Sequence, residues 1–189
     1  MSEEKKTMLC DVDGVILDLL TPWVDIVNKR YGTNVCVDDI VDYNLAKAFP
    51  MLEPHCIYDV LQEEELWLKA QPKPQVSLFL NELMCLGVDV RIVTATHWKN
   101  AAYKFEWFQR YLPFISWDQF IISNDKSIIN GDLLIDDNPQ HILKTSCSKK
   151  LLFDAPYNRV LSGVPGGYIR VDDWSQVFSQ VCYLLNLEI

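Results

Sequence analysis

Short apolar segments alternate with longer amphipathic segments along most of this chain. Runs dominated by apolar residues predict strands at 8–10, 88–93, 120–123, 133–135 and 151–153. Apolar residues at helical spacing predict helices at 17–31, 75–86, 101–111 and 174–187. Strands that alternate with helices are typical of a parallel sheet covered by helices on both faces. The pattern therefore predicts an α/β protein with a Rossmann-like parallel sheet.

The stretch between the first helix and residue 74 has a different character. It carries the acidic runs Asp38-Asp39 and Glu63-Glu64-Glu65, the prolines Pro50 and Pro54, and scattered aromatic residues. This composition predicts a mostly helical insertion in the alternating pattern. A second irregular stretch, a loop, is expected around Gly163, Pro165, Gly166 and Gly167.

Size and composition narrow the class of protein. The chain has 189 residues, 49% of them hydrophobic, which is enough for one well-packed domain with a modest insertion. Its net charge of -9 argues against the broad basic surface of a non-specific nucleic-acid binder. Its apolar runs fall short of the roughly 20 residues that cross a bilayer, so no membrane partner is expected. The six cysteines form no Cys-x-x-Cys pair and the first residues lack a signal-peptide pattern, which favours a cytoplasmic location.

Polar residues follow several of the predicted strands. They are Asp11 and Asp13 after the first strand, Thr94 after the second, Lys126 just past 120–123, and Asp136 with Asp137 after 133–135. Side chains alternate along a strand, so Asp11 and Asp13 are expected to face the same side. Adjacent parallel strands bring their carboxyl ends to one edge of the sheet, where ligands bind in open α/β folds. We therefore expect these side chains to meet at that edge.

Such a group of side chains favours phosphoryl chemistry. Several crowded carboxylates repel one another unless a cation neutralises them. Oxygen ligands without a His or Cys partner favour Mg²⁺, which keeps several waters and is usually completed by a substrate phosphate. A carboxylate cluster with one hydroxyl and one lysine fits that chemistry. A structural reading also exists, because Asp13-Gly14 is a common turn dipeptide and Asp136-Asp137 before Asn138-Pro139 suits a helix start.

The order of these residues resembles the four signature motifs of the haloacid dehalogenase superfamily. The matching stretches are, in chain order, Asp11-Val12-Asp13-Gly14-Val15, Thr94, Lys126 and Asp136-Asp137. Within the superfamily, residues 125–137 are similar to the 5′(3′)-deoxyribonucleotidases, and residues 38–43 and 152–159 are similar to bacterial members. The resemblance implies a haloacid dehalogenase-like core formed by residues 1–16 and 75–189. It also implies that residues 17–74 form a small helical cap inserted after the first strand.

The resemblance further implies a Mg²⁺-dependent phosphatase. Asp11 would attack phosphorus to form an aspartyl-phosphate, and Asp13 would protonate the leaving alkoxide and then accept a proton from water. Thr94 and Lys126 would hold the phosphoryl oxygens. The implied metal ligands are Asp11, the backbone carbonyl of Asp13, and Asp137, with Asp136 in a supporting position.

For the substrate, the resemblance implies a small phosphate ester, in particular a deoxynucleoside monophosphate. Lys104 aligns with a phosphate-contacting lysine of the nucleotidases, although its helix also suits a solvated charge. Tyr43 and Trp67 are candidates for stacking on the base, although aromatic residues at helical spacing also belong to cores.

Other functions stay open at the level of sequence. One is a phosphatase of the same superfamily that acts on another small phosphate ester or on a nucleic-acid phosphate end. Another is a non-catalytic binding protein that keeps the scaffold. A homodimer is also open, because Trp107, Trp117 and Trp174 suit either a core or a contact between subunits.

Overall fold

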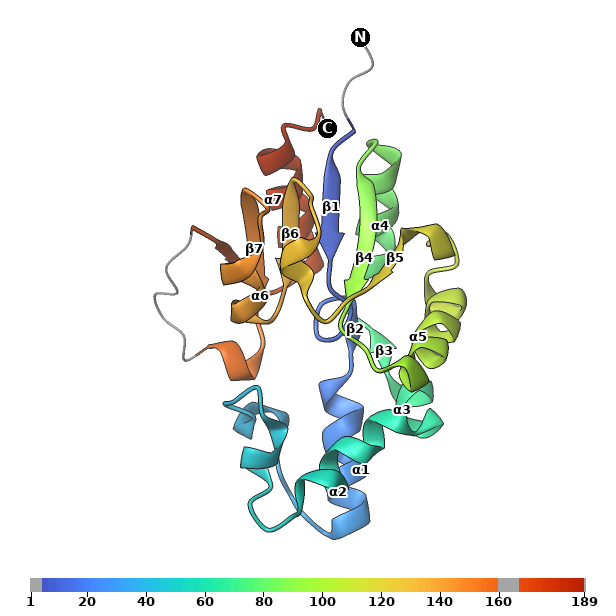
Figure 1. The fold of residues 1–189 in the computed structure, drawn as a ribbon, viewed down its shortest axis with the longest axis vertical. Helices are drawn as coiled ribbons and strands as arrows, with labels where there is room; N and C mark the ends of the chain where they lie inside the picture. Colours follow the sequence, from blue (N-terminus) through green and yellow to red (C-terminus); the bar gives the residue numbers. More distant parts are fainter. Residues whose placement is uncertain (1–4, 160–166, 189) are drawn as a thin grey trace.

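The fold is organised around a sheet of six parallel strands. The structure, a computed structural model, describes residues 5–159 and 167–188, so the loop expected at Gly163, Pro165 and Gly166 lies outside the described residues. The strands are β1 (Thr7–Cys10), β4 (Asp89–Thr94), β5 (Phe120–Ile122), β6 (Leu133–Asp136), β7 (Lys149–Phe153) and β8 (Ile169–Val171). They pair in the order β5-β4-β1-β6-β7-β8, all parallel, which confirms the predicted α/β architecture (Figure 1).

The order of the strands creates a switch point beside β1. The chain lays β4 and β5 on one side of β1 and then returns to lay β6, β7 and β8 on the other side. In such doubly wound sheets the crevice outside the carboxyl ends of the strands at the switch point binds ligands. The ladder of β1 and β6 pairs Cys10 with Ile135, and the Asp11 N–H donates to the Ile135 carbonyl at 2.9 Å. The residues that follow each strand are therefore held side by side.

Alternation along the strands divides the core into two layers. In β1, Met8 and Cys10 belong to the larger apolar cluster, which includes residues of α4 (Val76–Cys85) and α7 (Trp174–Leu185). Leu9 belongs to a smaller cluster that includes Ile142 of α6 (Pro139–Lys144). This is the burial on both faces that a parallel sheet requires. The remaining helix of this part, α5 (Trp98–Tyr111), lies near β5, where Phe108 packs edge-on against Phe120.

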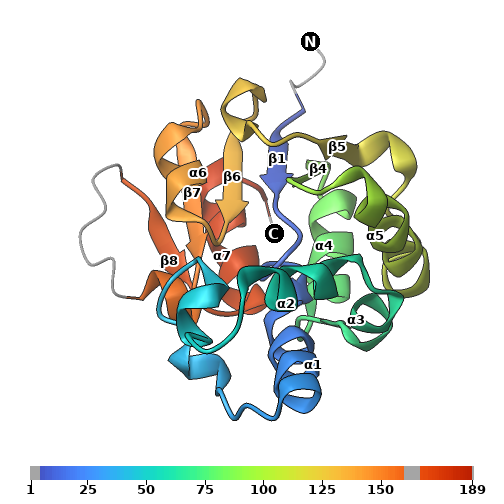
Figure 2. The same ribbon diagram turned by 60° about the horizontal axis from the view of Figure 1, so that its bottom comes forward.

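Residues 17–72 leave the sheet and return to it through two short neighbouring strands. Between β2 (Leu17–Asp18) and β3 (Gln71–Pro72) the helical elements are α1 (Leu20–Tyr31), η1 (Val37–Asp39), η2 (Leu45–Ala48), α2 (Pro54–Tyr58), η3 (Asp59–Gln62) and α3 (Glu64–Lys69). β2 and β3 pair antiparallel, and the Lys73 N–H donates to the Ile16 carbonyl at 2.8 Å. In Figures 1 and 2, α1, α2 and α3 lie beyond the carboxyl ends of the central strands.

Some element boundaries differ from those predicted. The first helix starts at Leu20 and not at residue 17, because Leu17 and Asp18 extend to pair with β3. The helix expected from residue 101 starts at Trp98, because the His97 ring accepts a hydrogen bond from the Lys99 N–H at 3.3 Å and caps it. Strand β8 was not predicted. None of the described helices combines the length and the apolar character that a membrane span requires.

Two of the tryptophans left open by the sequence belong to the core. Trp107 and Trp174 are buried, whereas Trp117 is exposed. The Trp174 indole N–H donates to the carbonyl of Val15 at 2.9 Å. Helix α7 therefore holds the turn that follows Asp11 and Asp13, and the fold links its last helix to its first loop.

We predict that Trp174→Phe lowers the free energy of unfolding by about 1–3 kcal/mol, because the buried Val15 carbonyl loses its donor. The measurement is urea denaturation followed by circular dichroism. Trp98→Phe is the matched control: Trp98 is 75% exposed and its indole nitrogen has no hydrogen-bond partner among the described residues. The control should change stability by less than about 0.5 kcal/mol. Equal losses in the two variants would contradict this assignment.

Candidate active site

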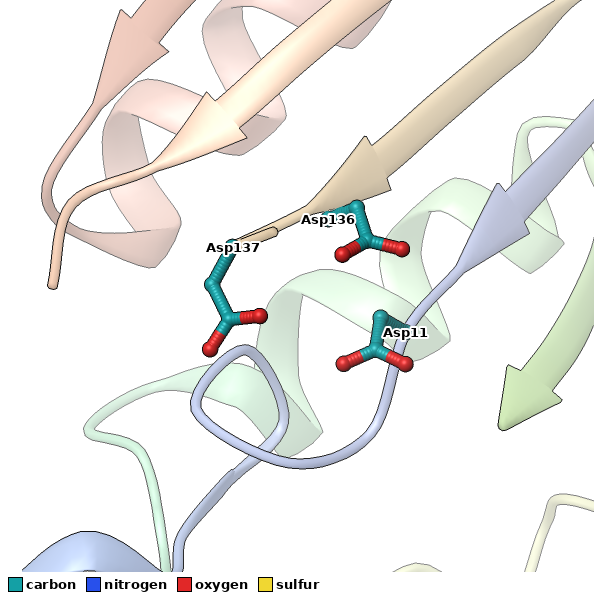
Figure 3. A group of neighbouring side chains, drawn as sticks. All are labelled: Asp11, Asp136 and Asp137. Atoms are coloured by element: carbon teal, nitrogen blue, oxygen red, sulfur yellow. The ribbon is translucent and has the colours of Figure 1, made fainter. Parts of the chain in front are cut away.

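Three carboxylates from β1 and β6 meet at the switch point. Asp11 follows β1, Asp136 ends β6, and Asp137 comes directly after it. One oxygen of each lies within 4.8 Å of the others, and all three residues are buried (Figure 3). The structure therefore brings together acids from the first and the fourth sequence motif.

A single lysine lies among these acids. Lys126 begins the short helix η5 (Lys126–Ile128), and Asp125 caps that helix by accepting a hydrogen bond from the Ser127 N–H at 3.0 Å. The Lys126 ammonium, only 2% exposed, contacts Asp11 Oδ1 and lies 2.7 Å from Asp136 Oδ2. With all three carboxylates ionised, the one ammonium would leave two negative charges uncompensated. This deficit equals the charge of a divalent cation, and oxygen donors of this kind suit hard cations.

Burial disfavours the ionised form of each of the three acids. Burial raises the pKa of Asp11 to about 6; the charges of Asp136 and Asp13 add to the rise, while Lys126 opposes it. Burial, followed by the charges of Asp11 and Asp136, raises the pKa of Asp137 well above its ordinary value. Burial also disfavours ionised Asp136, but its contacts with His141 and Lys126 hold its pKa below the ordinary value.

Asp13 takes part in a separate set of contacts. Lys104 of α5, only 3% exposed, donates to Asp13 Oδ2 at 2.6 Å and to Thr94 Oγ1 at 2.7 Å. The other oxygen of Asp13, Oδ1, is buried without a hydrogen-bond partner among the described residues. Lys104, considered only through the family resemblance, therefore lies directly against two motif residues.

The environment of Asp137 contains residues that the sequence analysis did not assign to the site. The Tyr157 hydroxyl donates to Asp137 Oδ2, and the Asn158 amide donates to the Asp137 carbonyl at 2.8 Å. Gly14 has a φ of 81°, and a Cβ at this position would lie 2.1 Å from Asp137 Oδ2. In the sequence, residues 152–159 show only a similarity to bacterial members of the superfamily. No spacing in this stretch indicates a contact with Asp137.

His141 of α6 contacts one of the acids, although no motif in the sequence pointed to it. Its Nδ1 lies 3.0 Å from Asp136 Oδ2. The Asn138 N–H donates to Asp136 Oδ1 at 2.8 Å. Both oxygens of Asp136 therefore have protein partners.

A cavity of about 410 Å³ opens from the acids toward the inserted helices. Its charged end includes Asp11, Asp13 and Lys126, and its other end is formed by apolar and aromatic side chains together with an amide: Leu19, Leu20, Trp23, Tyr43, Asn44, Leu45, Tyr58 and Leu61. Tyr43 lies in this wall, as expected for a base contact. Trp67 does not: it is 4% exposed, its indole N–H donates to the Leu61 carbonyl, and its ring lies 5.6 Å from the Lys104 ammonium.

Comparison with known proteins gives the family. Residues 5–185 match the family model described as "5' nucleotidase, deoxy (Pyrimidine), cytosolic type C protein". The chain belongs to this family. A 5'(3')-deoxyribonucleotidase of Clostridium acetobutylicum is 31% identical over 173 residues, covering 90% of this chain and 91% of the relative. One of Bacillus subtilis strain 168 is 30% identical over 177 residues, covering 92% and 96%.

Solved structures with the same fold are haloacid dehalogenase-type hydrolases. One from Deinococcus radiodurans, with bound phosphate and sodium, has a TM-score of 0.67 at 13% identity and covers 97% of both chains. One from Bacillus subtilis, bound to magnesium, has a TM-score of 0.62 at 11% identity, covering 95% of this chain and 99% of that one. These identities show the fold alone. Together with the family match, they make this nucleotidase-family chain a haloacid dehalogenase-type phosphatase, a phosphoric monoester hydrolase.

We predict that Gly14→Ala lowers phosphatase activity by about 10²-fold, because the added methyl group displaces the Asp137 carboxylate. Steady-state hydrolysis of a nucleotide ester measures the loss. Gly32→Ala is the matched control, since Gly32 also has a positive φ, 68°, but a Cβ there meets nothing within 4 Å. The control should lose about 1–2 kcal/mol of stability and keep its activity. Similar activities in the two variants would show that the space beside Asp137 is unimportant.

Proposed function

We propose that this protein is a Mg²⁺-dependent phosphatase that hydrolyses nucleoside monophosphates, in particular 5′(3′)-deoxyribonucleotides, through an aspartyl-phosphate. The observation that carries the proposal is one cavity with two ends. A buried cluster of three carboxylates beside one lysine forms one end, and apolar and aromatic side chains form much of the other. A phosphate ester with a flat, weakly polar leaving group matches this division. The relatives named 5'(3')-deoxyribonucleotidase support the same substrate class.

The acids have the chemistry of a magnesium site. Asp11, Asp137 and the backbone carbonyl of Asp13 would hold the ion, while Asp136, with both oxygens occupied by protein partners, would stay in a supporting position. The space that Gly14 leaves beside Asp137 keeps that carboxylate close to Asp11. When bound, the ion supplies positive charge against the phosphate, which a carboxylate nucleophile cannot otherwise approach.

Lys126 and Lys104 would have different roles around the phosphorus atom. Lys126 contacts Asp11 and would stabilise negative charge on the phosphoryl group that Asp11 accepts. Lys104 and the Thr94 hydroxyl are 2.7 Å apart and would hold phosphoryl oxygens together. Lys104 occupies Asp13 Oδ2 and leaves Oδ1 for proton exchange with the leaving alkoxide and then with water.

Residues 17–74 would act as a cap over the core formed by residues 1–16 and 75–189. The antiparallel pair β2–β3 is the place where the chain enters and leaves this segment. The base would lie among aromatic side chains of the cavity wall, where Tyr43, Trp23 and Tyr58 are available. The Trp23 indole N–H already donates to the Ile57 carbonyl at 2.7 Å, so its ring offers packing and not a hydrogen bond. Trp67, buried outside the wall, would not contact the base.

We predict that Asp11→Asn lowers hydrolysis of deoxyuridine and thymidine monophosphates by at least about 10⁴-fold, because an amide cannot serve as the nucleophile. Phosphate release in the presence of Mg²⁺ is the measurement. Asp25→Asn, at an exposed position on α1, is the control and should retain the wild-type rate.

The wild-type panel also includes sugar phosphates and an oligonucleotide with a terminal phosphate. A clear preference for the deoxynucleotides supports the proposal. Indifference to the base would favour another phosphate ester, and a preference for the oligonucleotide would favour a nucleic-acid end. A wild type inactive on every ester would support the non-catalytic alternative.

We predict that stabilisation by excess Mg²⁺ grows with pH. In the cation-free protein, a proton on Asp11, whose pKa is raised to about 6, stabilises the fold at acidic pH, and this contribution is lost as pH rises through that value. Bound Mg²⁺ takes the place of such protons. Mg²⁺ should therefore raise Tm by about 5 °C or more at about pH 7.5, and by less than half as much at about pH 5.

Differential scanning fluorimetry at constant ionic strength measures these shifts. Asp137→Asn is the control and should abolish most of the Mg²⁺ effect at both pH values. An equal rise in Tm at the two pH values, or an unchanged rise in Asp137→Asn, would argue against a cation held by the buried acids.

A further inference from the structure

Two residues of the short helix η6 (Pro156–Asn158), which follows β7, form hydrogen bonds with Asp137. Asn158, fully buried, donates from Nδ2 to the carbonyls of Asp137 and Phe153, both at 2.8 Å. The neighbouring Tyr157 hydroxyl donates to the Asp137 carboxylate at Oδ2. The backbone and the side chain of this acid are therefore both held by residues outside the four motifs.

The helix that carries Tyr157 is itself firmly anchored. Asn158 Oδ1 accepts hydrogen bonds from Arg170 of β8 at 2.6 Å and from the Ala155 N–H at 3.2 Å. Arg170 also pairs with Asp154 at 2.7 Å. Because η6 is fixed to the sheet in this way, the Tyr157 hydroxyl is a fixed donor and not a mobile one.

The ring of Tyr157 connects Asp137 to the far wall of the cavity. It packs edge-on against Tyr43, with ring centroids 5.6 Å apart and an interplanar angle of 88°. Tyr43 is 62% exposed, and both tyrosines line the cavity. A second contact joins the same two segments, since Arg159 lies 3.1 Å from Asp38. A path of direct contacts thus runs from Asp137 through Tyr157 to a side chain of the inserted segment.

We propose that Tyr157 is a positioning residue that fixes the Asp137 carboxylate for cation binding, and that Tyr43 acts on the cation through Tyr157. The inference rests on the proposed cation site, and it adds a coupling between that site and the wall expected to meet the base. The hydroxyl holds Oδ2, so the carboxylate cannot rotate freely. The Tyr43 ring limits the movement of the Tyr157 ring and so preserves this orientation.

In this arrangement Tyr157 affects the affinity for the cation although it does not contact the cation itself. Residues that orient metal ligands typically contribute 10- to 100-fold to metal affinity. Coupling between two sites is reciprocal, so occupation of the cavity beside Tyr43 and binding of the cation should influence each other. A tyrosine that served only packing would show neither effect.

The test is calorimetric titration of Mg²⁺ into substrate-free protein, with Tm of the cation-free protein measured alongside. Tyr157→Phe keeps the ring and removes the hydroxyl; it should weaken Mg²⁺ binding about tenfold and, because the buried Asp137 carboxylate loses a donor, lower Tm by a few degrees while the protein stays folded. Tyr183→Phe, at a residue 76% exposed on α7, is the matched control and should bind Mg²⁺ as the wild type does.

Two further variants test the path through Tyr43. Tyr43→Ala should weaken Mg²⁺ binding several-fold although Tyr43 is not a ligand, whereas Tyr43→Phe, which keeps the ring, should not. In the double variant of Tyr43→Ala and Tyr157→Phe, the loss should equal that of Tyr157→Phe alone, because both act through one hydroxyl.

The outcomes separate this inference from the proposed function. Wild-type affinity in Tyr157→Phe would overturn the inference and leave the phosphatase proposal intact. Additive losses in the double variant would overturn the path through Tyr43. A wild type that binds Mg²⁺, loses affinity in Tyr157→Phe and yet hydrolyses no nucleotide would support the inference while overturning the proposed substrate. A wild type without Mg²⁺ affinity would overturn both.

Discussion

Mutual repulsion among three buried carboxylates is the constraint on which the rest of this structure depends. Asp11, Asp136 and Asp137 are brought within 4.8 Å of one another at the edge of the sheet, with one lysine ammonium between them. Such a group separates or takes up protons unless the surrounding structure holds it. Burial is the largest cause of the raised pKa values of Asp11 and Asp137, and the charges of the neighbouring acids add to both. A site in which carboxylates are held close together in the interior is suited to a ligand that supplies positive charge.

Hydrogen bonds to backbone groups near the acids hold the acids in place. The hydrogen bond from Asp11 to Ile135 continues the ladder of β1 and β6 past the last paired residues, so two acids from distant parts of the chain stay in register. Trp174 fixes the turn after Asp11, and Asn158 fixes the carbonyl of Asp137. These contacts come from the last helix and from the segment after β7. Segments far apart along the chain therefore keep a small group of oxygens together.

Sequence reasoning reached those parts of the site that depend on strand ends. Asp11, Thr94 and the pair at 136–137 each follow an apolar strand, and the topology of parallel sheets converts that order into proximity. It did not reach Tyr157 or His141, because their partners depend on where a loop and a short helix return in space, and neither position carries a periodic signal. Strands β2 and β3, with two residues each, are too short for a pattern to predict. Trp67 looked like a candidate base contact because aromatic residues suit both a core and a binding wall, and only packing distinguishes the two.

The two lysines belong to different groups of contacts. Lys126 is committed to Asp11 and Asp136, whereas Lys104 is committed to Asp13 and Thr94. Lys126 lies on η5 and lines the cavity, whereas Lys104 lies on α5 and is not among the residues that line it. The charge of Asp13 still contributes to the raised pKa of Asp11, so the two groups influence each other. The ring of Trp67, which is buried in the inserted segment, packs beside the Lys104 ammonium. The group formed by Lys104, Asp13 and Thr94 therefore also includes a residue of the inserted segment. The inserted segment therefore contacts both groups, at Lys104 through Trp67 and at Asp137 through Tyr43 and Tyr157.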